Sequence, residues 1–87
     1  MAAVTRALLR ERGIDYFVAA LGAEGLEMEP HCSCGEAVDE EYFCEACNRT
    51  TRPTFVACLS GAALSEVERL VRGNPHFRNF GCSMLDE

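Results

Sequence analysis

Residues 31–47 read HCSCGEAVDEEYFCEAC, and this stretch indicates how the protein is held together. It contains four of the six cysteines of the chain, arranged as two close pairs: Cys32 with Cys34, and Cys44 with Cys47. Zinc prefers four ligands in a tetrahedron, and two cysteine pairs on two tight turns can supply them while the residues between the pairs form a hairpin. Gly35 and Asn48 each follow a pair directly and tolerate positive φ, which suits a chain that wraps around a metal ion. The stretch therefore predicts a metal site.

The order and spacing of six residues in this stretch indicate which kind of metal site it forms. The order is Cys-x-Cys-Gly, a short hydrophilic loop and Phe-Cys-x-x-Cys, formed by Cys32, Cys34, Gly35, Phe43, Cys44 and Cys47. With this pattern, residues 31–54 resemble the short zinc-ribbon family, although the first pair is one residue shorter than the Cys-x-x-Cys of that family. The resemblance implies that zinc is bound by Cys32, Cys34, Cys44 and Cys47. Because the first pair is shortened, His31 is the adjacent substitute for Cys32 as a ligand.

The chemistry of the cluster leaves several interpretations open. Structural zinc is the first, iron in a rubredoxin-type or cluster site is the second, and disulfides or free thiols are the third. Four thiolates close the coordination shell of zinc, so catalysis at this metal is not expected. His31 can be interpreted as a metal ligand, as a hydrogen-bond donor to a thiolate, or as neither.

The chain has 87 residues, which gives room for one domain, residues 1–87. A chain this short buries a smaller fraction of its surface than a larger one does, so a bound metal would contribute useful stability. Arg6, Arg10 and Arg12 interrupt the apolar stretch that a secretory signal requires, and residues 16–21 are too short a run to cross a bilayer. We expect a cytoplasmic protein without membrane contact, in which reduced thiols favour metal binding over disulfides.

Hydrophobic spacing predicts one helix and two strands before the cysteine stretch. Val4, Leu8 and Leu9 recur at helical spacing, and Gly13 can end this helix in a left-handed conformation. Residues 14–21 favour a strand because of their aromatic and β-branched side chains, residues 22–25 favour a turn, and residues 26–29 alternate as in a second strand. A hairpin is therefore expected to lead into the cysteines.

The residues after the cysteine stretch predict a strand, a helix and a second strand. Residues 54–59 are apolar, and Ser60 can cap a helix with an apolar stripe. Residues 76–85 alternate so that one strand face carries Phe80, Cys82 and Met84. The predicted class is α+β. A zinc-ribbon-like hairpin is inserted between an N-terminal helix and strand segment and a C-terminal βαβ-like unit, residues 54–85.

Charge limits the choice of partners. The formal net charge is −6, and the chain carries eight acidic residues and no Lys or Arg between Glu24 and Glu45. This negative charge would repel phosphate backbones, so nucleic acid is an unfavoured partner. The acidic run at residues 36–41 is interpreted as a solvated loop.

Other candidate groups have weaker signals. Cys44 and Cys47 form a Cys-x-x-Cys that could act in thiol redox chemistry, but such motifs normally stand at a helix N-terminus without a second pair nearby. Cys58 and Cys82 occupy apolar strand positions and are interpreted as core residues. His76 follows a proline and is interpreted as exposed, although a second site with these two cysteines stays open. No catalytic constellation with specific spacing is present in the sequence.

Three functional hypotheses follow. The first is a zinc-stabilised binding, adaptor or regulatory protein that is not an enzyme. Its partner is another protein, which meets either the acidic ribbon or the aromatic segment around Phe77 and Phe80. The second is a redox or metal-handling protein that uses Cys44 and Cys47. The third is a nucleic-acid-associated ribbon that uses four arginines: Arg49, Arg52, Arg69 and Arg72.

Overall fold

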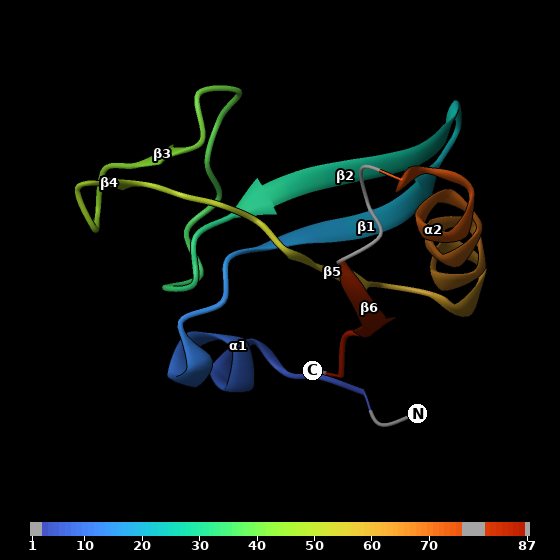
Figure 1. Cartoon of the computed structure of the whole chain (residues 1–87), viewed down its shortest axis with the longest axis horizontal. Coiled ribbons are helices and arrows are strands. Elements are labelled where there is room, and N and C mark those ends of the chain that lie inside the picture. The colour runs from blue at the N-terminus through green and yellow to red at the C-terminus, as the bar shows by residue number, and fades with distance from the viewer. Residues whose placement is uncertain (1–2, 76–79, 87) are drawn as a thin grey trace.

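The computed structural model describes residues 3–75 and 80–86 of the chain. Within these residues the chain forms two helices and six strands (Figure 1). In chain order these are α1 (Arg6–Arg12), β1 (Tyr16–Gly22), β2 (Gly25–His31), β3 (Phe43–Cys44), β4 (Arg49–Thr50), β5 (Phe55–Cys58), α2 (Gly61–Gly73) and β6 (Gly81–Met84). The strands form a four-stranded sheet in the order β2-β1-β5-β6 and a two-stranded sheet of β3 and β4. The predicted α+β class is confirmed.

The expected N-terminal hairpin is present. Strands β1 and β2 pair antiparallel from Tyr16 opposite His31 to Gly22 opposite Gly25. Gly25 has a φ of 122°, which only glycine adopts without strain, and this explains the tight turn at the end of the hairpin. On its other side, β1 pairs parallel with β5, so the hairpin and the C-terminal half share one sheet.

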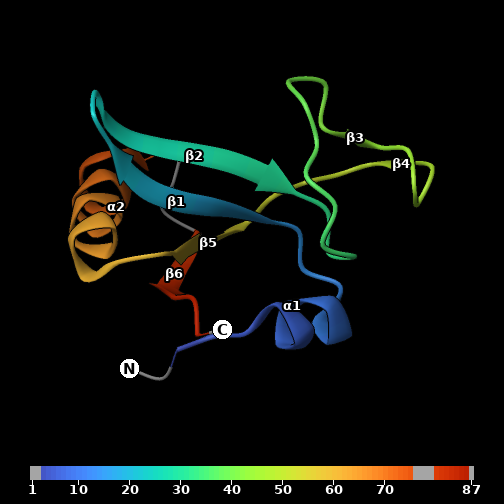
Figure 2. The same ribbon diagram turned by 180° about the vertical axis from the view of Figure 1, so that it is seen from behind.

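The expected βαβ-like unit is also present. Strands β5 and β6 are parallel neighbours, and α2 connects them (Figure 2). The Ser60 side chain caps α2 by accepting a 3.1 Å hydrogen bond from the N–H of Ala63. The final strand is shorter than the predicted residues 76–85, since β6 covers Gly81–Met84 and residues 76–79 lie outside the described part of the chain. His76 and Phe77 are among those residues.

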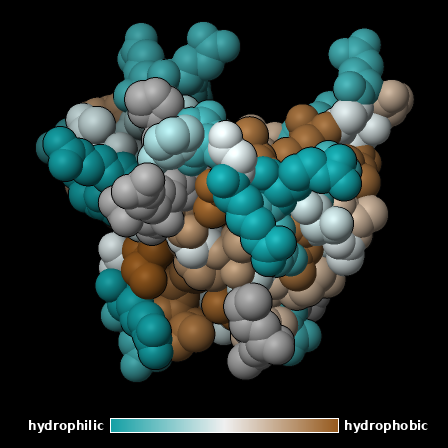
Figure 3. Space-filling view, turned by 45° about the vertical axis from the view of Figure 1, so that its right-hand side comes forward, coloured by the Kyte–Doolittle hydropathy of each residue, from teal (hydrophilic) through white to brown (hydrophobic). Residues whose placement is uncertain are grey.

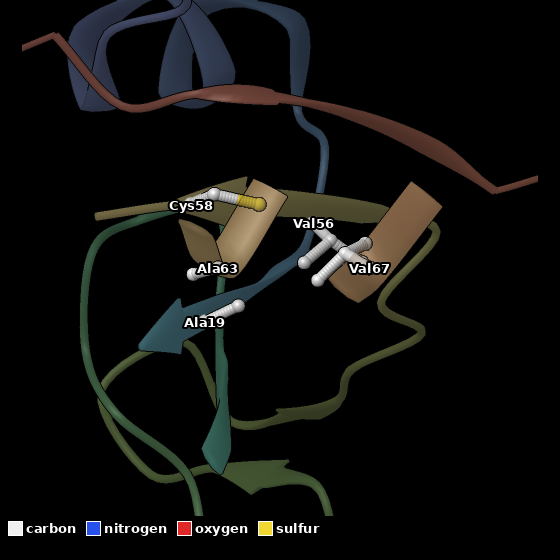
Figure 4. Close-up of a cluster of buried hydrophobic side chains, with 5 residues drawn as sticks. All are labelled: Ala19, Val56, Cys58, Ala63 and Val67. Carbon is white, nitrogen blue, oxygen red and sulfur yellow. The ribbon is translucent and has the colours of Figure 1, made fainter. Parts of the chain in front are cut away.

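Two hydrophobic clusters cover the two faces of the four-stranded sheet. Helix α2 packs on the first face, where side chains from β1, β5 and α2 point toward one another: Ala19, Val56, Cys58, Ala63 and Val67 (Figure 4). Leu9 of α1 packs with Tyr16 and Ala57 on the second face. Cys58 is fully buried and Cys82 packs against the same cluster, which confirms that both are core residues.

Capping residues define both ends of the short helix α1. The Thr5 hydroxyl accepts a hydrogen bond from the N–H of Leu8, and Gly13 ends the helix with a φ of 66°, as predicted. The N–H of Val4 donates to Met84, and the N–H of Asp86 donates to Val4. The two ends of the described chain therefore lie side by side (Figures 1 and 2).

The predicted hairpin between the two cysteine pairs is wrong in its position. Residues 35–42 form a loop, with an isolated bridge between His31 and Ala37, and the hairpin of β3 and β4 instead encloses the second cysteine pair. Val38 is the one buried side chain of this loop, and its acidic residues are exposed. The backbone of this loop bonds back to the end of β2 instead, since the N–H of Val38 donates to Pro30 and the carbonyl oxygen of Glu36 accepts from Cys32.

Some hydrophobic side chains remain at the surface. On the face shown in Figure 3, hydrophilic side chains lie mainly across the upper part, and hydrophobic side chains adjoin one another below them. Large side chains with substantial exposure include Leu21, Tyr42, Phe43, Leu59 and Leu70. Neither helix of the described chain is long and apolar enough to span a membrane.

Candidate metal centre

The structure brings the sulfur atoms of the two cysteine pairs together. The Sγ atoms of Cys32, Cys34, Cys44 and Cys47 all lie within 4.8 Å of one another. The Sγ atoms of Cys32 and Cys47 are 3.7 Å apart, and those of Cys34 and Cys44 are also 3.7 Å apart. A tetrahedron with metal–sulfur bonds of about 2.3 Å has edges of about 3.8 Å. The four sulfurs are thus placed so that they could hold one metal ion.

The first pair sits in a tight turn directly after β2. The carbonyl oxygen of Cys32 accepts a 2.9 Å hydrogen bond from the N–H of Gly35, and the N–H of Cys32 donates to Glu36 at 2.9 Å. Gly35 has a φ of 103°, as its position after the pair predicted. The turn brings Cys32 and Cys34 into the cluster although one residue, Ser33, separates them.

The second pair sits at the turn of the β3–β4 hairpin. Cys44 ends β3, and Asn48, with a φ of 53°, precedes β4. The carbonyl oxygen of Tyr42 accepts hydrogen bonds from the N–H and the hydroxyl of Thr51, at 2.6 and 2.8 Å. These bonds close the base of the hairpin. Cys44 is buried and Cys47 is exposed, so the cluster lies at the protein surface.

His31 lies beside the cluster but outside it. Its Nε2 atom is 2.9 Å from Oε1 of Glu29, and its Nδ1 atom is 3.3 Å from the carbonyl oxygen of Gly35. Its ring stacks on that of Tyr16, with centroids 5.3 Å apart. Both ring nitrogens therefore contact groups other than sulfur. These contacts place Cys32, and not His31, with the other three cysteines.

Arg49 contributes a contact that the sequence reasoning missed. Its guanidinium Nη2 donates to Sγ of Cys32 at 3.2 Å and to Oγ of Ser33 at 3.2 Å. An N–H donor next to a thiolate offsets part of its negative charge. The third hypothesis placed Arg49 on a nucleic-acid surface, whereas in the structure its side chain contacts the cysteine cluster.

Asp15 holds Arg49 in place. This carboxylate is 6% exposed, and it accepts hydrogen bonds from both guanidinium Nη atoms of Arg49 and from the backbone N–H groups of Ser33 and Arg52, each of the latter at 2.8 Å. Burial alone would raise the pKa of Asp15, but these hydrogen bonds outweigh it and lower the pKa below its usual value. Asp15 thus connects the segment before β1 to the first cysteine turn through Ser33 and to β4 through Arg49. No spacing signal predicts this pairing, because 34 residues separate the two partners.

The thiols of the cluster differ from those of the core. Burial raises the pKa of Cys32, but hydrogen bonds from Cys34, Cys44 and Cys47 outweigh it and lower this pKa to about 7. Hydrogen bonds with Cys34 and Cys32 raise the pKa of Cys47 to about 12. The cluster therefore favours a thiolate at Cys32. In the core, burial raises the pKa of Cys58 to about 11.

The four arginines of the nucleic-acid hypothesis do not form one surface. Arg49 lies on β4, whereas Arg69 and Arg72 lie on α2 at the other end of the molecule (Figure 1). Arg69 is 3.7 Å from Glu66, and Arg72 is 3.4 Å from Glu68. The basic side chains are thus dispersed and partly neutralised.

Comparison of the chain with protein-family models, with curated proteins and with solved structures found no match. The role of the cluster therefore has to follow from its own residues.

Proposed function

We propose that this chain is a small protein-binding module whose ribbon is held together by a structural zinc ion bound to Cys32, Cys34, Cys44 and Cys47. The observation that carries the proposal is the sulfur cluster, in which all four Sγ atoms lie within 4.8 Å of one another and the two 3.7 Å separations match the edges of a zinc–thiolate tetrahedron. The spacing pattern shared with short zinc ribbons supports the same assignment.

Zinc fits the surroundings of the cluster. Four thiolates around Zn²⁺ carry two net negative charges, and the Arg49 guanidinium beside Cys32 offsets part of that charge. The shell is complete with four sulfurs, so no position is left for a water or substrate. This arrangement supports a structural role over a catalytic or thiol-redox role. Iron bound by the four cysteines is the alternative, and elemental analysis must distinguish it from zinc.

The ribbon has little apolar packing of its own. Its hydrophobic cluster consists of Cys32, Val38 and Cys44, with Cys34 packed against them. Three of these four residues are proposed metal ligands, so their packing depends on the metal. The larger clusters under α1 and α2 contain none of the four cysteines. Metal binding is therefore proposed to fold the ribbon rather than the whole domain.

The surfaces favour an acidic binding face over an aromatic one. Phe80 packs against the core cluster and stacks with Phe17 at a centroid distance of 6.3 Å, and Phe77 lies outside the described residues. The aromatic segment is therefore used at least partly for packing. The acidic side chains of the ribbon loop stay exposed and available to a partner protein.

Elemental analysis of the purified protein tests the metal assignment. One zinc per chain is expected, and one iron per chain would replace zinc in the proposal. Chelation should then abolish amide protection in residues 32–51 while amides of α2 and β5 stay protected in hydrogen exchange. Metal-free protein with the same exchange pattern and melting temperature as the metal-bound form would refute the structural role.

A further inference from the structure

Strand β2 forms an open edge of the four-stranded sheet, because β1 is its one partner strand among the described residues (Figure 1). At its far end, the carbonyl oxygen of Pro30 points away from β1 and accepts a 3.0 Å hydrogen bond from Val38. Backbone groups alternate in direction along a strand, so Leu26 and Met28 direct their N–H and C=O groups to the same open side. Pro30 is tolerated in β2 because its missing N–H falls on this outer side.

A groove of ≈ 640 Å³ lies beside this edge. Met28 and Pro30 line it from β2, and Val38 and Tyr42 line it from the loop between the cysteine pairs. Tyr42 is 37% exposed, and Leu59, which also lines the groove, is 51% exposed. Backbone groups at a sheet edge together with adjacent apolar surface are what an extended peptide uses when it adds to a sheet as a new strand.

The charge of the groove selects for a basic segment. Its lining contains no basic side chain and four carboxylates, those of Glu27, Glu29, Asp39 and Glu40. Glu27 and Glu29 lie two residues apart and so share one face of β2. A strand paired to the open edge would place alternate side chains beside these two glutamates, where Lys or Arg would be attracted.

The same charges disfavour a second copy of this chain as the occupant. Pairing β2 with β2 of another copy would bring rows of glutamates close together, and like charges across a strand pair are destabilising. Charged edge residues are a common means by which proteins prevent such self-pairing.

The wall of the groove is held by the cysteine ribbon. Tyr42 has a φ of 57°, an uncommon conformation for a non-glycine residue. Its N–H donates to Asp39 at 3.0 Å, and its carbonyl oxygen accepts from Thr51 on the other side of the β3–β4 hairpin. The loop that carries Asp39, Glu40 and Tyr42 is anchored at both ends by cysteines of the cluster, Cys34 and Cys44.

We propose that the open edge of β2 and this groove bind an extended, lysine- or arginine-rich segment of a partner protein, which adds to the sheet as a fifth strand. The proposal deepens the binding function proposed above and rests on it, because the metal site anchors one wall of the groove.

The probe is an acetylated hexapeptide of alternating lysine and valine, titrated into zinc-loaded protein at low salt. Saturable binding is expected, with the largest NMR amide shifts at Leu26, Met28 and the loop residues 38–42. A peptide N-methylated at alternate positions keeps its charge but cannot pair with a strand, so it should lose binding. Equal binding of the methylated peptide, or amide shifts centred away from β2, would overturn the proposal.

Charge reversal provides the second arm of the experiment. The double variant Glu27→Lys with Glu29→Lys should weaken binding of the lysine peptide by about tenfold or more, because two attractive cross-strand pairs become repulsive. The matched control, Glu11→Lys with Asp86→Lys, makes the same change in net charge at exposed positions outside the groove and the ribbon. Equal weakening by the two double variants would mean nonspecific attraction and would contradict a specific site.

The metal content of each sample separates this proposal from the one before it. A zinc-loaded protein that does not bind the lysine peptide overturns the groove proposal and leaves the metal assignment standing. Metal-free protein that binds the peptide as tightly as the zinc-loaded protein would overturn the role of the ribbon as a wall of the groove, while the hydrogen-exchange experiment above decides the structural role of zinc separately.

Discussion

Arg49 forms a two-point ion pair with Asp15, and the same guanidinium donates a hydrogen bond to Sγ of Cys32. The pair links the segment between α1 and β1 to the cysteine ribbon. Asp15 is buried, whereas the Arg49 side chain is 39% exposed. The ribbon is therefore attached to the main sheet by a charged contact as well as by the continuous chain.

Removing the buried carboxylate should weaken the fold. We expect Asp15→Asn to lower the free energy of unfolding by about 2 kcal/mol, because the substitution leaves the Arg49 charge next to a partly desolvated site without its counter-charge. Urea denaturation of the metal-loaded protein measures this change. Arg52→Met is the matched control, since Arg52 contacts Asp15 through its backbone N–H and that bond would remain.

A double-mutant cycle isolates the pair itself. If Asp15 and Arg49 act together, the double variant Asp15→Asn with Arg49→Met should be less destabilised than the sum of the two single variants. Strictly additive effects would show that the ion pair contributes no coupling energy.

Arg49 should also slow the loss of metal. We expect Arg49→Met to transfer zinc to a competing chelator about tenfold faster than the unsubstituted protein, because groups that hydrogen-bond to metal ligands often change affinity by about this factor. The transfer rate is followed by the absorbance of a colorimetric chelator. Arg49→Lys keeps the charge but loses the forked geometry, so its rate should fall between the two. Identical rates for all three proteins would mean that the Arg49–Cys32 contact does not affect the metal.

The sequence predicted the large elements because each carries a local signal. The hairpin of β1 and β2 follows from alternation around Gly25, and α2 follows from its Ser60 cap and apolar stripe. The convergence of the four cysteines followed from their spacing. The Asp15–Arg49 pair could not be predicted, since neither residue has a local pattern that announces a partner 34 positions away. The hairpin between the pairs was misplaced because ribbon spacing fixes the turns and not the strands between them.

His31 and Cys32 are adjacent, but only the substitution of Cys32 should abolish metal binding. His31→Ala should keep one metal per chain, because its ring nitrogens contact Glu29 and Gly35. It should lower stability by about 1–2 kcal/mol through loss of the stacking on Tyr16. Cys32→Ser should lose the metal, as should Cys44→Ser and Cys47→Ser, whereas the core variant Cys58→Ser should retain it. Metal per chain after gel filtration decides these cases, and metal retention by Cys32→Ser would assign a different fourth ligand.

Gly35 should be required by its backbone conformation rather than by space. A Cβ at Gly35 would meet no atom within 4 Å, and the same is true at Gly61, the first residue of α2. The two positions differ in φ, which is 103° at Gly35 and outside the positive range at Gly61. Gly35→Ala should therefore cost about 1–3 kcal/mol and loosen the first cysteine turn. Gly61→Ala should stabilise the protein by up to about 1 kcal/mol, because alanine has fewer unfolded conformations to lose. Thermal melts of the two zinc-loaded variants compare these effects directly. If the Gly35→Ala protein melts no lower than the Gly61→Ala protein, the first cysteine turn can form without a positive φ at residue 35.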